Sequence, residues 1–186
     1  MQRFLFGFFF GTVFGLTVGT ITGLFPRINA ALTVIIGVAR CVPNVAWIPI
    51  CIMTLGISEP AKIVLIMIGC FWSVFINTEG GIRGIDPKYL EVARLLGKNR
   101  ITCIFRVILP AAFPSILMGI REGFGNAWKG IAVAELIASS SGLGFMIAYS
   151  REIARPDVMF IGLMSIGGVG LILDILIKGI QKKILQ

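Results

Sequence analysis

The feature that most limits what this chain can fold into is the uncharged apolar run from Phe4 to Pro26, which is bounded by Arg3 and Arg27. A helix needs about 20 apolar residues to cross the hydrocarbon core of a bilayer, so this run is long enough. Of the 186 residues, 56% are hydrophobic and 14% are charged. Soluble domains carry about 25% charged residues, and the sequence therefore predicts an integral membrane protein.

Four more apolar stretches follow, at residues 29–58, 62–78, 111–138 and 158–177, so an all-α bundle of about five spans is expected. Pro43 and Pro49 interrupt the first of these stretches. It is expected to be kinked or discontinuous, because proline removes a backbone hydrogen bond. Short outer turns are expected at residues 58–60 and 139–144. In the run from 4 to 26, glycine recurs every fourth residue, which predicts one flat face for close approach of a neighbouring helix: Gly7, Gly11, Gly15, Gly19 and Gly23.

The longest polar segment runs from Asp86 to Pro110, between two apolar stretches. Asp86 suits a helix N-cap and Pro87 suits the first helical position. Residues 88–96 predict a short helix, which Gly97 is placed to end in a left-handed turn. A second helical run from Ile101 is expected to close at Pro110. Basic residues outnumber acidic ones here and favour a cytoplasmic docking surface: Arg83, Lys88, Arg94, Lys98, Arg100 and Arg106, against Asp86 and Glu91.

Three landmarks within this segment have a characteristic spacing. Glu91, Val92 and Ala93 are followed after three residues by Gly97, and after nine more by the Val-Ile-Leu-Pro of residues 107–110. This resembles the EAA loop of binding-protein-dependent ABC import permeases, whose pattern is Glu-Ala-Ala, three residues, Gly, nine residues and Ile-x-Leu-Pro. Valine stands at two positions of that pattern, and both changes keep a small aliphatic side chain. The alternative is an ordinary amphipathic loop helix between two membrane spans.

Two other stretches, residues 40–63 and 134–147, resemble permeases that import nitrate, sulfonates and taurine. The resemblance implies the type I ABC importer permease fold over residues 1–186 as a single domain, with residues 82–110 as a cytoplasmic helix-turn-helix coupling loop. It also implies the residues that couple the permease to a separate ATPase: Glu91, Ala93, Arg94, Gly97, Leu109 and Pro110. Permeases of this family usually have six spans. The chain is therefore expected to lack the first family helix, either as a partial chain or as a shortened permease.

The partners implied by the resemblance are a cytoplasmic ABC ATPase dimer, a second permease copy in a homodimer, an external solute-binding protein and membrane lipid. ATP would bind to the partner ATPase, and this chain itself would need no cofactor. The expected location is the inner membrane of a prokaryote. Ten basic residues would then lie on the cytoplasmic side: Arg27, the six basic residues in or just before the polar segment, and the three lysines of the C-terminal tail. This excess of positive charge inside obeys the positive-inside rule. The C-terminus and the coupling loop are thus expected to be cytoplasmic.

Basic residues within the spans are candidates for the translocation path, because an intramembrane charge usually faces a cavity or a partner. Arg121, Gly125, Trp128 and Lys129 share one side of a helix and could favour an anion. Weaker candidates for the same cavity are Trp72, Asn77 and Arg40. The alternative is that Arg121 pairs with a neighbouring carboxylate, Glu122 or Glu135 being near in sequence, while Lys129 reaches the outer surface.

The composition argues against catalysis by this chain. It contains no histidine and no GxxxxGK[ST] phosphate loop, so no catalytic or metal-binding residue is predicted and ATP hydrolysis is assigned to another chain. Its four cysteines form no CxxC pair, and the basic residues at the ends of apolar runs do not indicate nucleic-acid binding.

The same importer architecture could instead carry riboflavin or a pyrimidine precursor in place of a small anion. An ATP-independent secondary transporter or channel subunit would instead be expected to show inverted repeats and acidic relay residues.

Overall fold

The computed structural model describes residues 2–138 and 141–184, and the side chains of all of these except Leu90, Arg94, Arg100, Leu136, Ile137, Ala138 and Ile184. Every regular element in this part of the chain is helical. Four helical runs are long and apolar enough to cross a membrane: α1 (Gln2–Leu24), α4 (Glu59–Arg83), the run that includes α7 (Leu109–Ala138), and α9 (Pro156–Ile184). A fifth is obtained if α2 (Pro26–Cys41) and the segment Asn44–Leu55 count as one broken span. The prediction of about five spans is confirmed.

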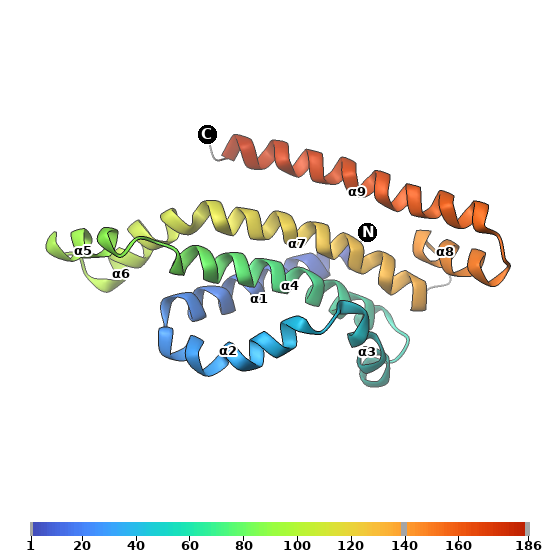
Figure 1. Ribbon diagram of the computed structural model, residues 1–186, viewed down its shortest axis with the longest axis horizontal. Coiled ribbons are helices and arrows are strands. Elements are labelled where there is room, and N and C mark those ends of the chain that lie inside the picture. Colours follow the sequence, from blue (N-terminus) through green and yellow to red (C-terminus); the bar gives the residue numbers. More distant parts are fainter. Residues whose placement is uncertain (1, 139–140, 185–186) are drawn as a thin grey trace.

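The centre of the bundle is α4, which lies between α1 and α7 (Figure 1). The glycines of α1 meet α4 residues that also recur every fourth position: Ile66, Cys70, Val74, Thr78 and Ile82. A Cβ atom added to any of these glycines would lie only 2.7 to 2.9 Å from the facing Cβ. Each partner lies 59 residues later, so α1 and α4 run parallel. The predicted flat face is confirmed, and α4 is the helix that occupies it.

The opposite side of α4 is covered by α7, which runs antiparallel to it. Gly123 of α7 faces Val74, the residue that also faces Gly15 of α1, and Val74 is completely buried. Phe4 and Phe8 of α1 contact the ring of Phe124 on α7, with ring centroids 4.8 and 5.3 Å apart. The three helices therefore share one apolar core around Ile66, Cys70 and Val74.

The proline-containing stretch is broken as predicted. Helix α2 ends at Cys41, and a 3-10 turn η1 (Asn44–Trp47) and α3 (Ile48–Leu55) follow. The segment Asn44–Leu55 is bent by 95° from α2. Pro49 stands in the first turn of α3, where a missing N–H is tolerated. Asn44 at the break donates to the carbonyl of Leu65 on α4 at 3.4 Å, which anchors the break to the bundle.

Helix α4 is longer than the sequence predicted. The expected outer turn at residues 58–60 is in fact the start of the helix, with Ser58 at the N-cap position and Pro60 in the first turn. The other end continues to Arg83, whose guanidinium bonds the Glu79 carboxylate one turn earlier at 2.9 Å. Pro60 at the start and the Glu79–Arg83 pair at the end therefore both belong to the helix.

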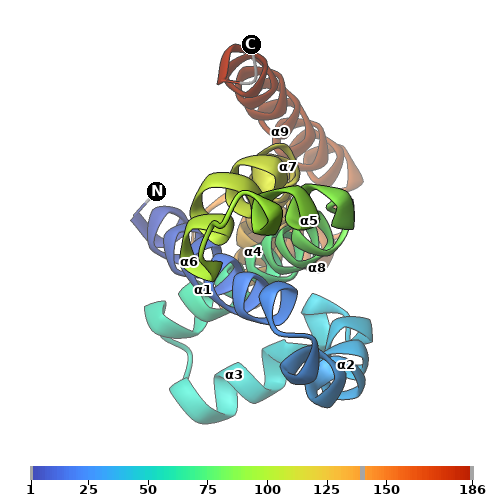
Figure 2. The same ribbon diagram turned by 90° about the vertical axis from the view of Figure 1, so that its left-hand side faces the viewer.

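The second expected outer turn, at residues 139–144, is also only partly correct. Residues 139 and 140 lie outside the described part of the chain, but Gly142 has φ +119° and Leu143 already begins a helix that the sequence did not predict, α8 (Leu143–Glu152). Helix α9 then returns along α7 and lies at the margin of the bundle, as both views show (Figures 1 and 2). It is mostly exposed.

The polar segment forms α5 (Pro87–Leu95), α6 (Arg100–Cys103) and a π-helical turn η2 (Ile104–Ile108) that leads directly into α7. The prediction that the helix closes at Pro110 is wrong. In the π turn the Leu109 amide donates to the carbonyl of Ile104, five residues back. This wider turn gives Pro110 room to enter α7 without the backbone hydrogen bond it cannot make. The segment is therefore joined to α7 as one continuous helical run.

Candidate functional sites

The first candidate site is α5, which projects beyond the end of the membrane-length helices (Figure 1). Its start is capped as the sequence predicted, because the Asp86 carboxylate accepts the backbone N–H of Lys88 at 2.9 Å. Its end is also as predicted. Gly97 has φ +67°, and the Lys98 amide donates to the Ala93 carbonyl at 3.1 Å, the bond of a Schellman-type helix end.

The two faces of α5 differ sharply. Ala93 is 5% exposed and faces the rest of the protein, whereas Glu91 is exposed. Large apolar side chains also face outward: Tyr89, Val92, Leu95 and Leu96. The side chain of Arg94 lies outside the described part of the structure. A projecting helix that exposes apolar side chains together with the charged Lys88 and Glu91 could enter a groove of another protein.

Leu109 and Pro110, the last two predicted coupling residues, begin α7. Leu109 is half-buried and Pro110 is exposed. Asn99 caps the preceding α6, since its side-chain oxygen accepts the Thr102 amide at 2.8 Å, a cap that the sequence analysis missed. A movement of α5 would therefore reach α7 through the short run of α6 and the π turn.

The second candidate site is a groove of about 550 Å³ between α7 and α9. Arg121, Gly125, Trp128 and Lys129 all line it, so the structure brings together the four residues predicted to share one helix side. The Trp128 indole links the two helices that form the groove, because its N–H donates to the Ile166 carbonyl of α9 at 3.1 Å. Trp72 and Arg40 do not line this groove, and Asn77 reaches only its edge, where it donates to Glu122 at 3.0 Å.

The charges of the groove are arranged unequally. Arg121 donates to Asp174 of α9 from Nε at 3.1 Å and from Nη2 at 3.0 Å, and Lys178 binds the other carboxylate oxygen at 2.8 Å. Lys129 is exposed, and its ammonium bonds only the neutral Asn126 side chain, at 3.2 Å, among the described residues. Lys129 is thus a groove cation without a carboxylate partner in the described structure.

The expected alternative for Arg121 was a carboxylate near it in sequence. The partner is instead Asp174, which the sequence analysis missed. The sequence did indicate it, because residues 158–177 contain a single acidic side chain. An unpaired charge within an apolar span costs free energy, so this carboxylate is expected to have a basic partner. Glu135, one of the two carboxylates considered, accepts the Gly144 amide at 3.1 Å at the start of α8. Among the described residues, no group of three Cys, Asp or Glu side chains could hold a metal ion.

Comparison with known proteins identifies the family. The model of the binding-protein-dependent transport system inner membrane component matches residues 11–186. The chain belongs to this family. A permease of this kind was the expectation from the EAA-like spacing, which is confirmed at the level of the family.

Three relatives of this permease are named for what they transport. A putative aliphatic sulfonates transport permease of Bacillus subtilis is 41% identical over 186 residues, which cover 100% of this chain and 67% of that protein. The taurine transport system permease of Escherichia coli is 33% identical over 184 residues, which cover 99% of this chain and 67% of that protein. A bicarbonate transport system permease of Synechococcus elongatus is 34% identical over an alignment that covers 100% of this chain and 67% of that protein.

The fold of this permease is shared with a solved transporter structure. An inward facing structure of the MetNI methionine ABC transporter superposes with a TM-score of 0.82 at 19% sequence identity, covering 98% of this chain and 91% of that chain. At this identity the likeness establishes the fold alone. The prediction of an all-α ABC importer permease fold is therefore confirmed.

Proposed function

We propose that this permease forms the translocation path of an ATP-driven importer for a small anion of the nitrate, sulfonate and taurine class, with bicarbonate as a further candidate. The observation that carries the proposal is the likeness, over at least 99% of the chain, to permeases named for aliphatic sulfonates, taurine and bicarbonate. A sulfonate group or bicarbonate presents a negative charge at neutral pH. The proposed substrate therefore shares one chemical feature across all three relatives.

The groove between α7 and α9 supports this proposal. Arg121 is engaged by Asp174, but Lys129 has no carboxylate partner among the described residues and remains exposed beside the groove. Glu122 and Asp174 also line the groove, but neither forms an ion pair with Lys129 in the described structure, so the lysine charge can attract an anion. We therefore place Lys129, rather than Arg121, at the anion-contacting position.

In the same proposal, residues 82–110 couple the permease to a separate ATPase on the cytoplasmic side. The outer face of α5 would enter a groove of the ATPase, Glu91 and the exposed apolar residues making the contact, while Ala93 packs inward. Movement of the ATPase would then displace α5 as a rigid body and pull on α7 through the π turn. An external solute-binding protein and a second copy of the permease would complete the importer.

Uptake in living cells tests the substrate class. A strain deleted for this permease and complemented with the gene is given labelled taurine, an alkanesulfonate, nitrate or bicarbonate. We expect loss of uptake of at least one of these anions in the deletion strain and its return on complementation. Lys129→Gln keeps a donor for Asn126 and removes the charge, and it should lower that uptake, whereas Lys182→Gln on the exposed tail should not. Unchanged uptake of all four anions in the deletion strain would exclude the proposed substrate class.

Co-purification tests the coupling role. Glu91→Lys reverses the charge on the outer face of α5 without disturbing a buried contact, and it is expected to release the ATPase from the solubilised complex. Lys182→Glu is the matched control, since it reverses an exposed charge at the same end of the bundle outside residues 82–110. Equal recovery of the ATPase with both variants would contradict docking at α5.

A further inference from the structure

Two polar side chains of α4 bond two polar side chains of α7 in matching register. The Asn126 amide donates to the Ser73 hydroxyl at 2.7 Å, and the Asn77 amide donates to the Glu122 carboxylate at 3.0 Å. The members of the two pairs lie four residues apart on each helix, which places them on one face. A Cβ atom at Gly119 would lie only 2.7 Å from Cβ of Asn77, so the two helices approach closely here and their register is fixed.

The Asn126 side chain connects this contact to the groove between α7 and α9. Its oxygen accepts the Lys129 ammonium at 3.2 Å, while its nitrogen donates to Ser73, which is only 8% exposed. An ammonium can only donate and an amide nitrogen does not accept, so this orientation of the amide is the one that satisfies both neighbours. The groove cation is therefore linked through one amide to a buried hydroxyl on α4.

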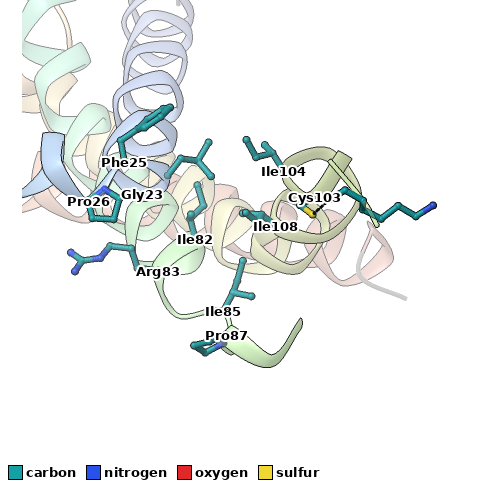
Figure 3. Close-up of a pocket in the computed structure, with 12 residues that line it drawn as sticks. Gly23, Phe25, Pro26, Ile82, Arg83, Ile85, Pro87, Cys103, Ile104 and Ile108 are labelled. Atoms are coloured by element: carbon teal, nitrogen blue, oxygen red, sulfur yellow. Dashed lines mark hydrogen bonds between the residues drawn. The ribbon is translucent and has the colours of Figure 1, made fainter. Parts of the chain in front are cut away.

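This link distinguishes Lys129 from a cation bonded to its own helix alone. Arg83 bonds Glu79 one turn earlier on α4, and its guanidinium extends away from a neighbouring cavity of about 630 Å³, as Figure 3 shows. Lys129 instead lines the groove, and two of its three N–H donors have no acceptor among the described residues. A cation held in place with free donors is suited to charge-assisted hydrogen bonds with an anion.

The nearby acidic side chain of the groove is engaged elsewhere. Glu122 precedes Lys129 by seven residues, about 10 Å along the helix axis, and accepts the Asn77 amide. We propose that Asn126 and Ser73 are positioning residues that hold the Lys129 ammonium in the groove for the anionic oxygens of the transported solute. This proposal rests on the place that the proposed function gives to Lys129.

The link also joins the two spans that flank the coupling segment. Helix α4 ends at Arg83, just before this segment, and α7 begins at Leu109, directly after the π turn. A displacement of one helix against the other would stretch the bond between Ser73 and Asn126 and move the ammonium. The position of the groove cation therefore depends on both helices.

Iodide quenching of Trp128 fluorescence tests the proposal on the purified permease. Trp128 lines the same groove as Lys129, and Trp47→Phe/Trp72→Phe leaves it as the only indole without removing a hydrogen bond of either indole N–H. Iodide is the anionic probe, acrylamide is the neutral reference, and chloride holds the ionic strength constant. Lys129→Gln should lower iodide quenching by up to about fivefold, the enrichment that one charge about 4 Å away gives in a water-like medium. Acrylamide quenching should not change, and the control Lys182→Gln should lower neither.

A double-variant cycle separates positioning from packing. Asn126→Ala and Ser73→Ala should each cause a smaller loss of iodide quenching, and neither should have a further effect in the Lys129→Gln protein, because both act through the ammonium. Ser73→Thr keeps the hydroxyl and should retain the quenching of the unchanged protein. Ser165→Ala is the matched control, since its hydroxyl bonds only the Ile161 carbonyl of its own helix.

The outcomes separate this proposal from the proposed function. Iodide quenching that is unaffected by Asn126→Ala and Ser73→Ala, or lowered equally by them in the Lys129→Gln protein, would overturn the positioning role and leave the anion-contacting role of Lys129 standing. Unchanged quenching in Lys129→Gln itself would overturn both roles. Because neither ATPase nor transported solute is present, exclusion of the substrate class in the uptake test would alter none of these values.

Discussion

Arg121 on α7 and Asp174 on α9 are joined by two hydrogen bonds to one carboxylate oxygen, at 3.1 and 3.0 Å, across 53 residues of sequence. Helix α9 is mostly exposed and makes few other polar contacts with α7, the main one being the bond from the Trp128 indole to Ile166. The ion pair is therefore a principal polar link between the last span and the bundle. It also engages Arg121, and Lys129 is then the groove-lining cation without a carboxylate partner among the described residues.

Breaking this pair should loosen α9. Interhelical hydrogen bonds in membranes contribute about 0.6 kcal/mol on average and up to roughly 1.7 kcal/mol. We expect Arg121→Ala and Asp174→Ala each to lower the thermal unfolding temperature of the detergent-solubilised permease, and the double variant to lose less than the two effects added. The exchange Arg121→Asp/Asp174→Arg should recover part of the loss. Fully additive effects of the single variants would show that the two side chains do not interact in the protein.

The close approach of α1 and α4 should be intolerant of side chains. A Cβ atom at Gly15 would lie 2.8 Å from Cβ of Val74, which has no free space because Gly123 of α7 faces its other methyl group. Gly15→Leu is therefore expected to destabilise the bundle by about 1–3 kcal/mol or more through overpacking. Gly167→Leu on α9, where a Cβ atom would meet nothing within 4 Å, is the control. The unfolding temperature and the yield of folded protein measure the difference, and equal values for the two variants would contradict this packing.

The left-handed turn after α5 should be specific for residues that tolerate a positive φ. Gly97 has φ +67°, and a β-branched residue pays roughly 1–2 kcal/mol in this region, whereas asparagine is accepted more readily. We expect Gly97→Val to disturb α5 and reduce ATPase recovery in co-purification, and Gly97→Asn to retain most of it. The spans should keep their unfolding temperature in both variants. A similar loss with valine and asparagine would indicate that the glycine is required for space and not for its backbone conformation.

The carboxylate of Glu135 should position the start of α8. It accepts the Gly144 amide at 3.1 Å, and Gly142 at the N-cap offers no side chain for this role. Loss of an N-cap acceptor costs about 0.5–2 kcal/mol, so Glu135→Ala should speed hydrogen exchange of the α8 amides. Glu135→Gln keeps an acceptor oxygen and should exchange more slowly than the alanine variant. Identical exchange in the three proteins would show that the contact does not hold α8.

Local features of the fold were accessible from the sequence. The cap at Asp86, the turn at Gly97, the break at Pro43 and the glycine face of α1 each depend on residues within one or two helical turns. Propensity and periodicity therefore predict them correctly. The same local reasoning wrongly predicted that the helix ends at Pro110. A π turn, which no sequence pattern predicted, lets the proline enter α7.

The sequence by itself determined that this protein is a membrane-embedded helical permease, since hydropathy and the spacing of Glu91, Gly97 and Pro110 are properties of the chain alone. Only the tertiary structure decided that α4 fills the glycine face, that Asp174 is the partner of Arg121, and that Lys129 is left without a carboxylate. The first two pairings join residues more than 50 positions apart. Which side chains meet depends on how whole helices align. The periodicity of apolar residues along one helix predicts which of its faces is apolar, but it does not predict which other helix covers that face.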